Sequence, residues 1–189
     1  FKGQQLKVVD LPGTYSLTPF SIEEITARDF ILNESPDIVV NIIDASNLER
    51  SLFLAIQILE LGRPAMFVLN MADVAHAKGI KIDEKKLSEL FGLPVVFTVG
   101  NKNKGIENLL DQALFEVNAF KEGKKSRPIK YSQVVEDCIL KIETLLRESQ
   151  FDTDGTLRWN AIKILENDKI VKQNLISTAP SCNYIVNTD

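Results

Sequence analysis

The sequence predicts an α/β fold, a parallel sheet with flanking helices, followed by a small all-α domain. Short apolar runs alternate with amphipathic helical stretches four times before residue 120, as in a parallel sheet covered by helices. The runs are rich in β-branched residues, which is typical of strands buried on both faces. After residue 130 only the helical spacing of apolar residues remains, so we expect helices alone there.

The elements of the first domain can be placed in order along the chain. The apolar runs predict strands at residues 6–9, 38–43, 65–69 and 94–98. Amphipathic spacing predicts helices at residues 22–33, 48–59, 83–90 and 105–120. Ser21 and Glu24 form a capping box before the first helix. Asn47 and Asp83 are the expected N-caps of the second and third, and Gly62 closes the second.

A change in composition after residue 120 indicates a domain boundary. Basic residues, glycine and proline crowd residues 121–130, which we interpret as a linker. Apolar spacing then predicts helices at residues 132–148, 157–165 and 168–175, and the final residues follow no clear pattern. We therefore expect a truncated first domain at residues 1–120, a linker at 121–130 and a helical domain at 131–189.

Polar residues follow three of the predicted strands. They lie in the segments 10–13, 70–73 and 99–101. The carboxyl ends of parallel strands share one edge of a sheet, and ligands of such sheets bind at that edge. We therefore expect these segments to build one ligand site.

The first segment, Asp10-Leu11-Pro12-Gly13, fits the pattern D-x-x-G. In GTPases this carboxylate holds a water on Mg²⁺, and the glycine N–H meets the γ-phosphate because glycine lets the backbone approach closely. The same four residues also fit an ordinary turn after a strand.

The second segment, Asn70-Met71-Ala72-Asp73, fits N-x-x-D. A carboxylate at Asp73 can accept from both N1–H and the exocyclic amine of guanine, a pairing that adenine does not offer. Asn70 can tie the base-binding loop to its neighbours, and the stem of Met71 can cover a face of the base. The competing interpretation is a helix N-cap.

The order of the motifs is the layout of a P-loop GTPase: D-x-x-G, then N-x-x-D sixty residues later, then a third strand end. The expected nucleotide-binding residues are Asp10, Leu11, Pro12, Gly13, Asn70, Met71, Asp73, Val99, Gly100 and Asn101. Asp10 is the expected contact to Mg²⁺, through water. No residue of this chain stands out as catalytic.

Five longer segments narrow the resemblance. They are residues 8–17, 44–52, 59–64, 69–73 and 157–166. Together they resemble the prokaryotic ferrous iron transporter B family. The resemblance implies a cytosolic G domain that binds GTP or GDP with Mg²⁺ and hydrolyses GTP slowly, assisted by K⁺. It also implies a helical domain that slows nucleotide dissociation, and an attached permease whose Fe²⁺ uptake is regulated at the cytoplasmic side of the inner membrane.

The sequence departs from that family in two places. Val99-Gly100-Asn101 replaces a Ser-Ala motif, so guanine contact there rests on backbone N–H groups. No G-x-x-x-x-G-K-[ST] motif occurs, so the phosphate-cradling loop is absent. The chain begins at Phe1 rather than Met, and we expect an amino-terminal truncation that removes the first strand and leaves nucleotide binding weak or absent and GTP hydrolysis inactive. The sheet then has an uncovered edge or rearranges, for instance by dimerising.

Composition excludes several other functions. The 22 basic and 26 acidic residues give a net charge of −4, which argues against a nucleic-acid partner. No apolar stretch is long enough for a transmembrane helix. Two alternatives stay open at this point: a non-enzymatic interaction module acting through the helical domain, and a ribosome-assembly GTPase of similar layout, which the acidic charge disfavours.

Overall fold

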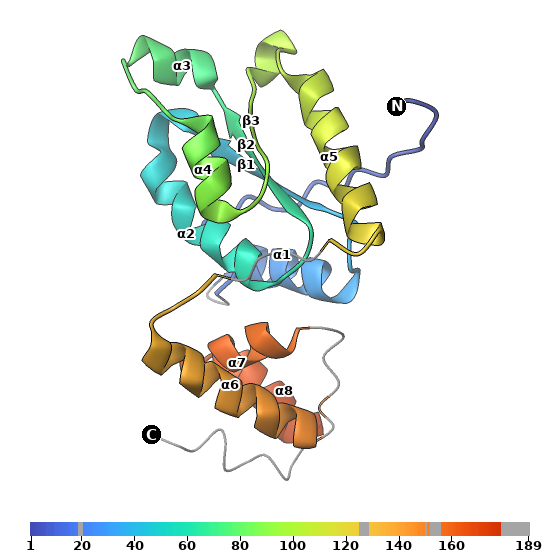
Figure 1. The fold of residues 1–189 in the computed structure, drawn as a ribbon, viewed down its shortest axis with the longest axis vertical. Helices are drawn as coiled ribbons and strands as arrows, with labels where there is room; N and C mark the ends of the chain where they lie inside the picture. The colour runs from blue at the N-terminus through green and yellow to red at the C-terminus, as the bar shows by residue number, and fades with distance from the viewer. Residues whose placement is uncertain (19–20, 125–128, 150, 152–155, 179–189) are drawn as a thin grey trace. The chain divides into compact units, whose positions relative to one another are not determined.

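The computed structural model describes residues 1–18, 21–124, 129–149, 151 and 156–178 (Figure 1). The chain divides into two compact units. The first comprises Phe1–Leu59 and Arg63–Arg127, and the second comprises Glu60–Gly62 and Pro128–Asp189.

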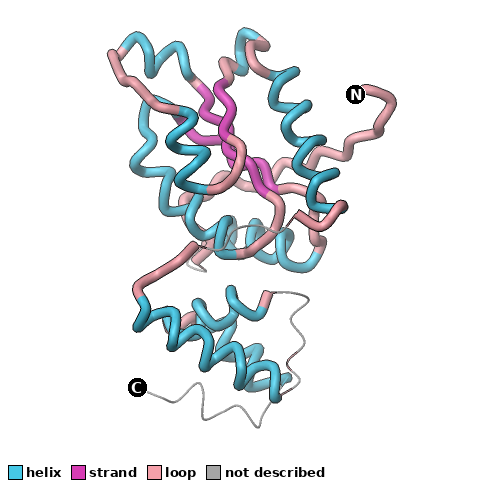
Figure 2. The backbone as a smooth tube through the Cα atoms, in the orientation of Figure 1, coloured by secondary structure: helices cyan, strands magenta, loops and turns pink. Residues whose placement is uncertain are grey.

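A parallel sheet lies at the centre of the first unit. Its strands are β1 (Val39–Asp44), β2 (Ala65–Asn70) and β3 (Val95–Phe97), in the order β1-β2-β3. Asp44 is in register with Asn70, and Leu69 is in register with Phe97. Figure 2 shows the strands surrounded by helices. The predicted parallel α/β fold is confirmed.

Helices cover both faces of the central strand β2. On one face, a cluster joins β2 and β3 to α5 (Ile106–Lys121), through Met66, Val68, Val96, Leu109 and Ala113. On the other face, the ring of Phe67 meets Phe91 edge-on at a centroid distance of 5.1 Å. Phe91 ends α4 (Glu84–Phe91). Successive side chains of β2 point to opposite faces of the sheet, so α5 covers one face and α4 covers the other.

Two of the predicted helix starts are confirmed in atomic detail. At α1 (Ile22–Asn33), the Ser21 hydroxyl accepts from Glu24 N at 3.2 Å, and the Glu24 carboxylate accepts from Ser21 N at 3.0 Å. At α4 the Asp83 carboxylate accepts from Lys86 N at 3.1 Å. Both caps are local in sequence, and this explains why pattern alone finds them.

The predicted cap at Asn47 is wrong. A short 3₁₀ turn, Ala45–Asn47, precedes α2 (Leu48–Glu60), and Asp44 caps it by accepting from Ser46 N at 2.8 Å. Asp44 ends β1, so the chain passes from strand to helix with no intervening loop.

The predicted strand at residues 6–9 is also wrong. In the part of the chain that the structure describes, this run has no partner strand, and Val8 is 85% exposed. A strand needs a neighbour for its backbone hydrogen bonds, and among the described strands β1 pairs with β2 alone. The expected burial of β1 on both faces fails as well, because Val40 and Ile42 are exposed.

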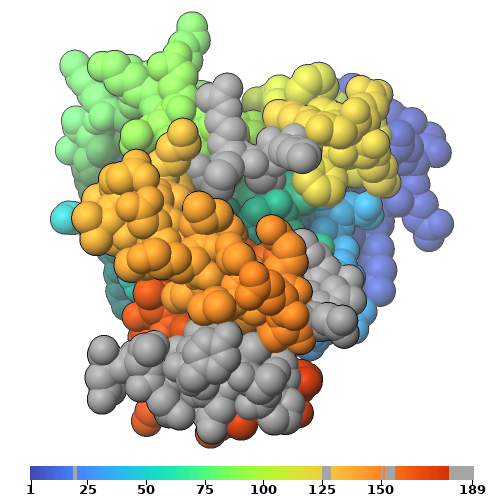
Figure 3. Space-filling view, turned by 60° about the horizontal axis from the view of Figure 1, so that its bottom comes forward, coloured from blue at the N-terminus to red at the C-terminus, as the bar shows by residue number. Residues whose placement is uncertain are grey.

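The second unit contains only helices among its described residues. These are α6 (Gln133–Glu148), α7 (Leu157–Leu165) and α8 (Lys169–Thr178). Ile139 of α6 packs against Ala161 and Ile162 of α7, while much of α6 lies at the surface (Figure 3, orange). The all-helical prediction is confirmed. In the described part of the chain no helix is both long and apolar enough to cross a membrane.

A buried ion cluster lies within this unit. Lys163 is 1% exposed, and its ammonium lies 2.7 Å from the Glu166 carboxylate and 3.3 Å from that of Glu60. The Tyr131 hydroxyl also donates to Glu60. Burial, together with this carboxylate, raises the pKa of Tyr131 well above its ordinary value. Losing one carboxylate would leave the Lys163 charge poorly compensated.

Candidate functional site

Asn70 joins the ends of two neighbouring strands. Its side-chain oxygen accepts from the Thr98 hydroxyl at 3.1 Å and from Gly100 N at 3.0 Å. Thr98 follows β3 and is buried. The loop after β3 is therefore fastened to the end of β2 by one amide side chain.

Met71 turns the chain away from the sheet. Its φ of 57° is left-handed, a conformation that costs a non-glycine residue of the order of 1 kcal/mol and is common at functional sites. Met71 is the N-cap of α3 (Ala72–Ala77) without any side-chain cap bond. Asn70 therefore does not serve as the N-cap. Met71 is about half exposed, so its side chain is available to cover a flat ligand.

The Asp73 carboxylate accepts two hydrogen bonds. Its Oδ1 accepts from Val74 N at 3.0 Å, and its Oδ2 accepts from the Lys102 ammonium at 2.6 Å. The hydrogen bond from Lys102 is the main reason that the pKa of Asp73 lies below its ordinary value. The group is thus an ionised acceptor at neutral pH, able to pair with two adjacent N–H donors of a ligand.

A tight loop follows β3. Val99 N donates to Lys104 O at 3.1 Å, and Lys102 N donates to Val99 O at 3.0 Å. Gly105 closes the loop at a φ of 80°, and a Cβ there would lie 2.3 Å from the Phe97 carbonyl oxygen. Only glycine fits this position without displacing backbone. The N–H groups of Val99 and Gly100 are both engaged within the protein, which leaves Asn101 as the better backbone contact for a ligand.

The segment predicted to contact phosphate and Mg²⁺ is residues 10–13, and in the described structure it is not bonded to the loops that carry Asn70 and Asp73. Asp10, Pro12 and Gly13 are exposed, and Leu11 is half-buried. Within the described residues, no hydrogen bond or ion pair joins them to Asn70 or Asp73. The structure therefore brings together the second and third predicted segments and leaves the first as extended chain.

The segment after Gly13 is anchored to α2 by residues that sequence reasoning missed. Gln57 is 2% exposed, and its side-chain oxygen accepts from Leu17 N at 2.6 Å. Its amide nitrogen donates to the Thr18 hydroxyl at 3.0 Å. Seven residues earlier on the helix, the Arg50 guanidinium stacks on the Tyr15 ring, 3.8 Å from its centroid. A glutamine within the apolar stripe of α2 was the available signal.

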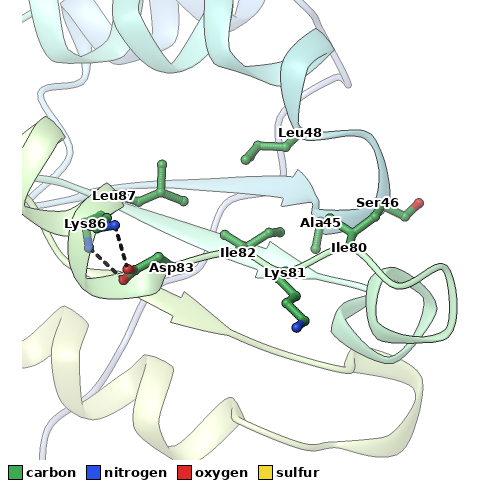
Figure 4. Close-up of a pocket in the computed structure, with 9 residues that line it drawn as sticks. All are labelled: Ala45, Ser46, Leu48, Ile80, Lys81, Ile82, Asp83, Lys86 and Leu87. Carbon is green, nitrogen blue, oxygen red and sulfur yellow. Dashed lines mark hydrogen bonds and ion pairs between the residues drawn. The ribbon is translucent and has the colours of Figure 1, made fainter.

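A shallow pocket lies elsewhere in the first unit (Figure 4). Its walls come from the turn after β1 and from the segment before α4, and include Ser46, Ile80 and Asp83. None of the predicted nucleotide residues lines it. Figure 4 shows the Asp83 carboxylate bonded to Lys86. This contact belongs to the N-cap of α4.

Comparisons with known proteins show the family to which the chain belongs. The family model for ferrous iron transport protein B matches residues 1–113, and the model for the FeoB cytosolic helical domain matches residues 131–183. The chain belongs to the FeoB family. The first match holds the D-x-x-G and N-x-x-D segments, and membership removes the ribosome-assembly alternative.

FeoB relatives cover nearly the whole chain. The Fe(2+) transporter FeoB of Methanocaldococcus jannaschii is 45% identical over 173 residues, which are 92% of this chain and 25% of that protein. The Fe(2+) transporter FeoB of Salmonella typhimurium is 38% identical over 87% of this chain and 21% of its own length. The chain thus spans a quarter or less of the length of these relatives.

Solved FeoB structures share the fold. The cytosolic domain of the T. maritima FeoB iron transporter in its GMPPNP form has a TM-score of 0.79 at 33% identity, covering 89% of this chain and 66% of that one. A GDP-bound mutant of S. thermophilus NFeoB has a TM-score of 0.82 at 34% identity, covering 94% and 68%.

Proposed function

We propose that this chain is the guanine-nucleotide-binding and helical region of a ferrous iron transporter. The observation that carries the proposal is the joined pair of loops at the sheet edge, in which Asn70 binds Gly100 N and the ionised Asp73 carboxylate is paired with Lys102. Relatives named as Fe(2+) transporters, and solved relatives that contain GDP or GMPPNP, support it.

Guanine recognition is assigned to Asp73. Its two oxygens accept from N1–H and the exocyclic amine, and a base without that pair of donors leaves the carboxylate unsatisfied. Asn70 keeps the loop in place, and the exposed side chain of Met71 covers one face of the base. Asn101 supplies the backbone contact to the base, because the N–H groups of Val99 and Gly100 are already bonded.

Asp10, Leu11, Pro12 and Gly13 are assigned to the phosphate end. The Asp10 carboxylate is exposed, which suits a contact to Mg²⁺ through water, since this ion keeps several waters and takes phosphate oxygens directly. No cluster of three or more metal-ligating side chains occurs in the described structure, so the nucleotide supplies the other oxygens. Bound Mg²⁺ neutralises phosphate charge. Gly13 contributes its N–H to the γ-phosphate.

The 189 residues hold no phosphate-cradling motif, so we propose weak nucleotide binding and no GTP hydrolysis by this chain alone. Most charge-assisted contacts to phosphate come from that motif. Calorimetry with GDP tests the proposal, with an affinity weaker than micromolar expected. Sub-micromolar affinity would contradict it.

A base-swap experiment tests the role of Asp73. Xanthine carries a carbonyl where guanine carries its exocyclic amine, so Asp73→Asn offers an amide donor in place of a carboxylate oxygen. We expect the variant to lose guanosine and to gain xanthosine, as measured by NMR titration. Asp83→Asn, in a capping position away from the loops, is the matched control.

The wider setting follows from the family. We propose that the chain acts at the cytoplasmic side of a prokaryotic inner membrane, with a permease in the same polypeptide as its partner. The division at residues 1–120, 121–130 and 131–189 belongs to this proposal, as does K⁺ as an assisting cation. A pull-down of the permease with residues 131–189 tests the partner.

A further inference from the structure

The Asp73 carboxylate is already occupied by the protein itself. One oxygen accepts from Val74 N at 3.0 Å, and the other accepts from the Lys102 ammonium at 2.6 Å. Guanine recognition requires both oxygens at once, because N1–H and the exocyclic amine are adjacent donors on one edge of the base. A bound guanine therefore competes with the Lys102 ammonium for Oδ2 of Asp73.

Lys102 lies in a loop that is closed by several hydrogen bonds. Lys102 ends the 3₁₀ turn Gly100–Lys102. The Asn70 side chain accepts from Gly100 N at the start of that turn, and Val99 and Lys104 form a bridge between the two ends of the loop. The backbone that presents Lys102 to Asp73 is thus fixed by the same amide that organises the proposed base site, and the lysine side chain is the part free to move.

We propose that Lys102 is a specificity-determining residue that competes with the guanine edge for Asp73. The inference rests on the proposed function. In the free protein the ammonium holds Oδ2 of Asp73 at 2.6 Å, and the guanine edge must weaken or replace this ion pair to take the same oxygen. Adenine offers no such pair of donors and leaves the ion pair in place. Lys102 thereby lowers the affinity for guanine and not the affinity for adenine.

The size of the effect follows from exposure. The side chains of Lys102 and Asp73 are 54% and 37% exposed, and ion pairs in such positions contribute little. We expect removal of the ammonium to tighten guanosine binding about two- to fivefold. Guanosine is the right probe because it has no phosphates, so other basic residues do not affect the comparison.

The experiment compares Lys102→Met with the unchanged chain by NMR titration of guanosine and adenosine. Methionine keeps the length of the apolar stem and loses the charge. Lys102→Arg keeps the charge and should match the unchanged chain, and Lys104→Met removes a neighbouring lysine of the same loop and should do the same. We expect Lys102→Met alone to bind guanosine two- to fivefold more tightly and adenosine no differently, so that discrimination in favour of guanosine rises.

A ligand-free measurement separates this inference from the proposed function. The carboxyl ¹³C signal of Asp73 should titrate at a higher pH in Lys102→Met than in the unchanged chain, and an equal titration overturns the inference. Guanosine binding that is unchanged or weaker in Lys102→Met also overturns it and leaves the proposed function standing. If no form binds guanosine and Asp73→Asn binds no xanthosine, the proposed function fails and the inference fails with it.

Discussion

Among single residues, Gly105 is the position where the loop after β3 is least tolerant. We expect Gly105→Ala to destabilise the first unit by about 2–4 kcal/mol, because the left-handed backbone disfavours a Cβ and the added atom would collide with the backbone carbonyl of Phe97. The added Cβ would lie 2.3 Å from that oxygen. Urea unfolding monitored by circular dichroism measures the loss.

Gly79 provides the matched control for Gly105. Its φ of 73° is similar, but no atom lies within 4 Å of an added Cβ. Gly79→Ala should cost only the backbone strain, about 1–2 kcal/mol. Equal losses at the two glycines would show that the close approach to Phe97 is unimportant.

Sequence predicts residues well where their partners are local. Ser21 and Glu24, three residues apart, were found from spacing, and so was the Asp83 cap. Lys102 and Gln57 were missed because their partners lie 29 and 40 residues away. No short pattern encodes such contacts. The assignments of Asp10 and Asp73 to a nucleotide stay predictions.

At the scale of elements, α2 fixes the course of the segment after Gly13. Gln57→Leu removes both bonds from this buried position and leaves Leu17 N without its acceptor, which costs about 1–3 kcal/mol. We expect faster hydrogen exchange at Leu17 N, measured by NMR. The Leu87 amide in α4 bonds to Asp83 O and should keep its rate. Unchanged exchange at Leu17 would contradict the anchoring role.

The first helix of the second unit is tied to α7 by a two-pronged ion pair. The Arg158 guanidinium donates to both Glu136 oxygens, at 2.7 and 2.9 Å. This contact lowers the pKa of Glu136 below its ordinary value. A carboxyl group whose pKa is lower in the folded state than in the unfolded state adds to the free energy of unfolding at pH values above its ordinary pKa. This contribution is lost as the pH falls through the pKa of the folded state.

Removing Arg158 should therefore change the acid response. We expect Arg158→Met to be less stable than the unchanged chain at pH 7, with a difference that shrinks as the pH falls through the lowered pKa of Glu136. Urea unfolding between pH 7 and pH 3 measures it. Glu136→Gln, which cannot titrate, should behave alike. A difference that is constant with pH would exclude Glu136 as the source.

The bounds of an element were predicted correctly where the apolar periodicity is complete within that element. The helix at Leu157–Leu165 has the expected bounds, and α6 differs by one residue at its start. The run at residues 6–9 has the composition of a strand and forms none, because pairing depends on a neighbour that composition cannot supply. The predicted cap at Asn47 is wrong because the helical turn begins earlier, where the Asp44 carboxylate at the end of β1 accepts from Ser46 N.

At the scale of the whole molecule, the outer face of β1 is exposed. Ile42 is 66% exposed and Val40 is exposed beside it, although both alternate with buried neighbours. An edge strand with open backbone groups and apolar side chains favours pairing with another chain. The exposed edge therefore predicts that two copies of this chain pair through β1.

Ile42→Lys tests this pairing. Burying an isoleucine contributes about 1.5–3 kcal/mol, and the substitution places one lysine in each copy close to the shared edge. We expect sedimentation to show dimers of the unchanged chain that dissociate at least tenfold more readily in the variant. Ile22→Lys changes another exposed isoleucine, on α1, and should leave association unchanged, because that helix lies outside the strand edge. A strictly monomeric profile of the unchanged chain contradicts the pairing, and equal weakening by both lysines assigns association to general apolar exposure rather than to the open edge of β1.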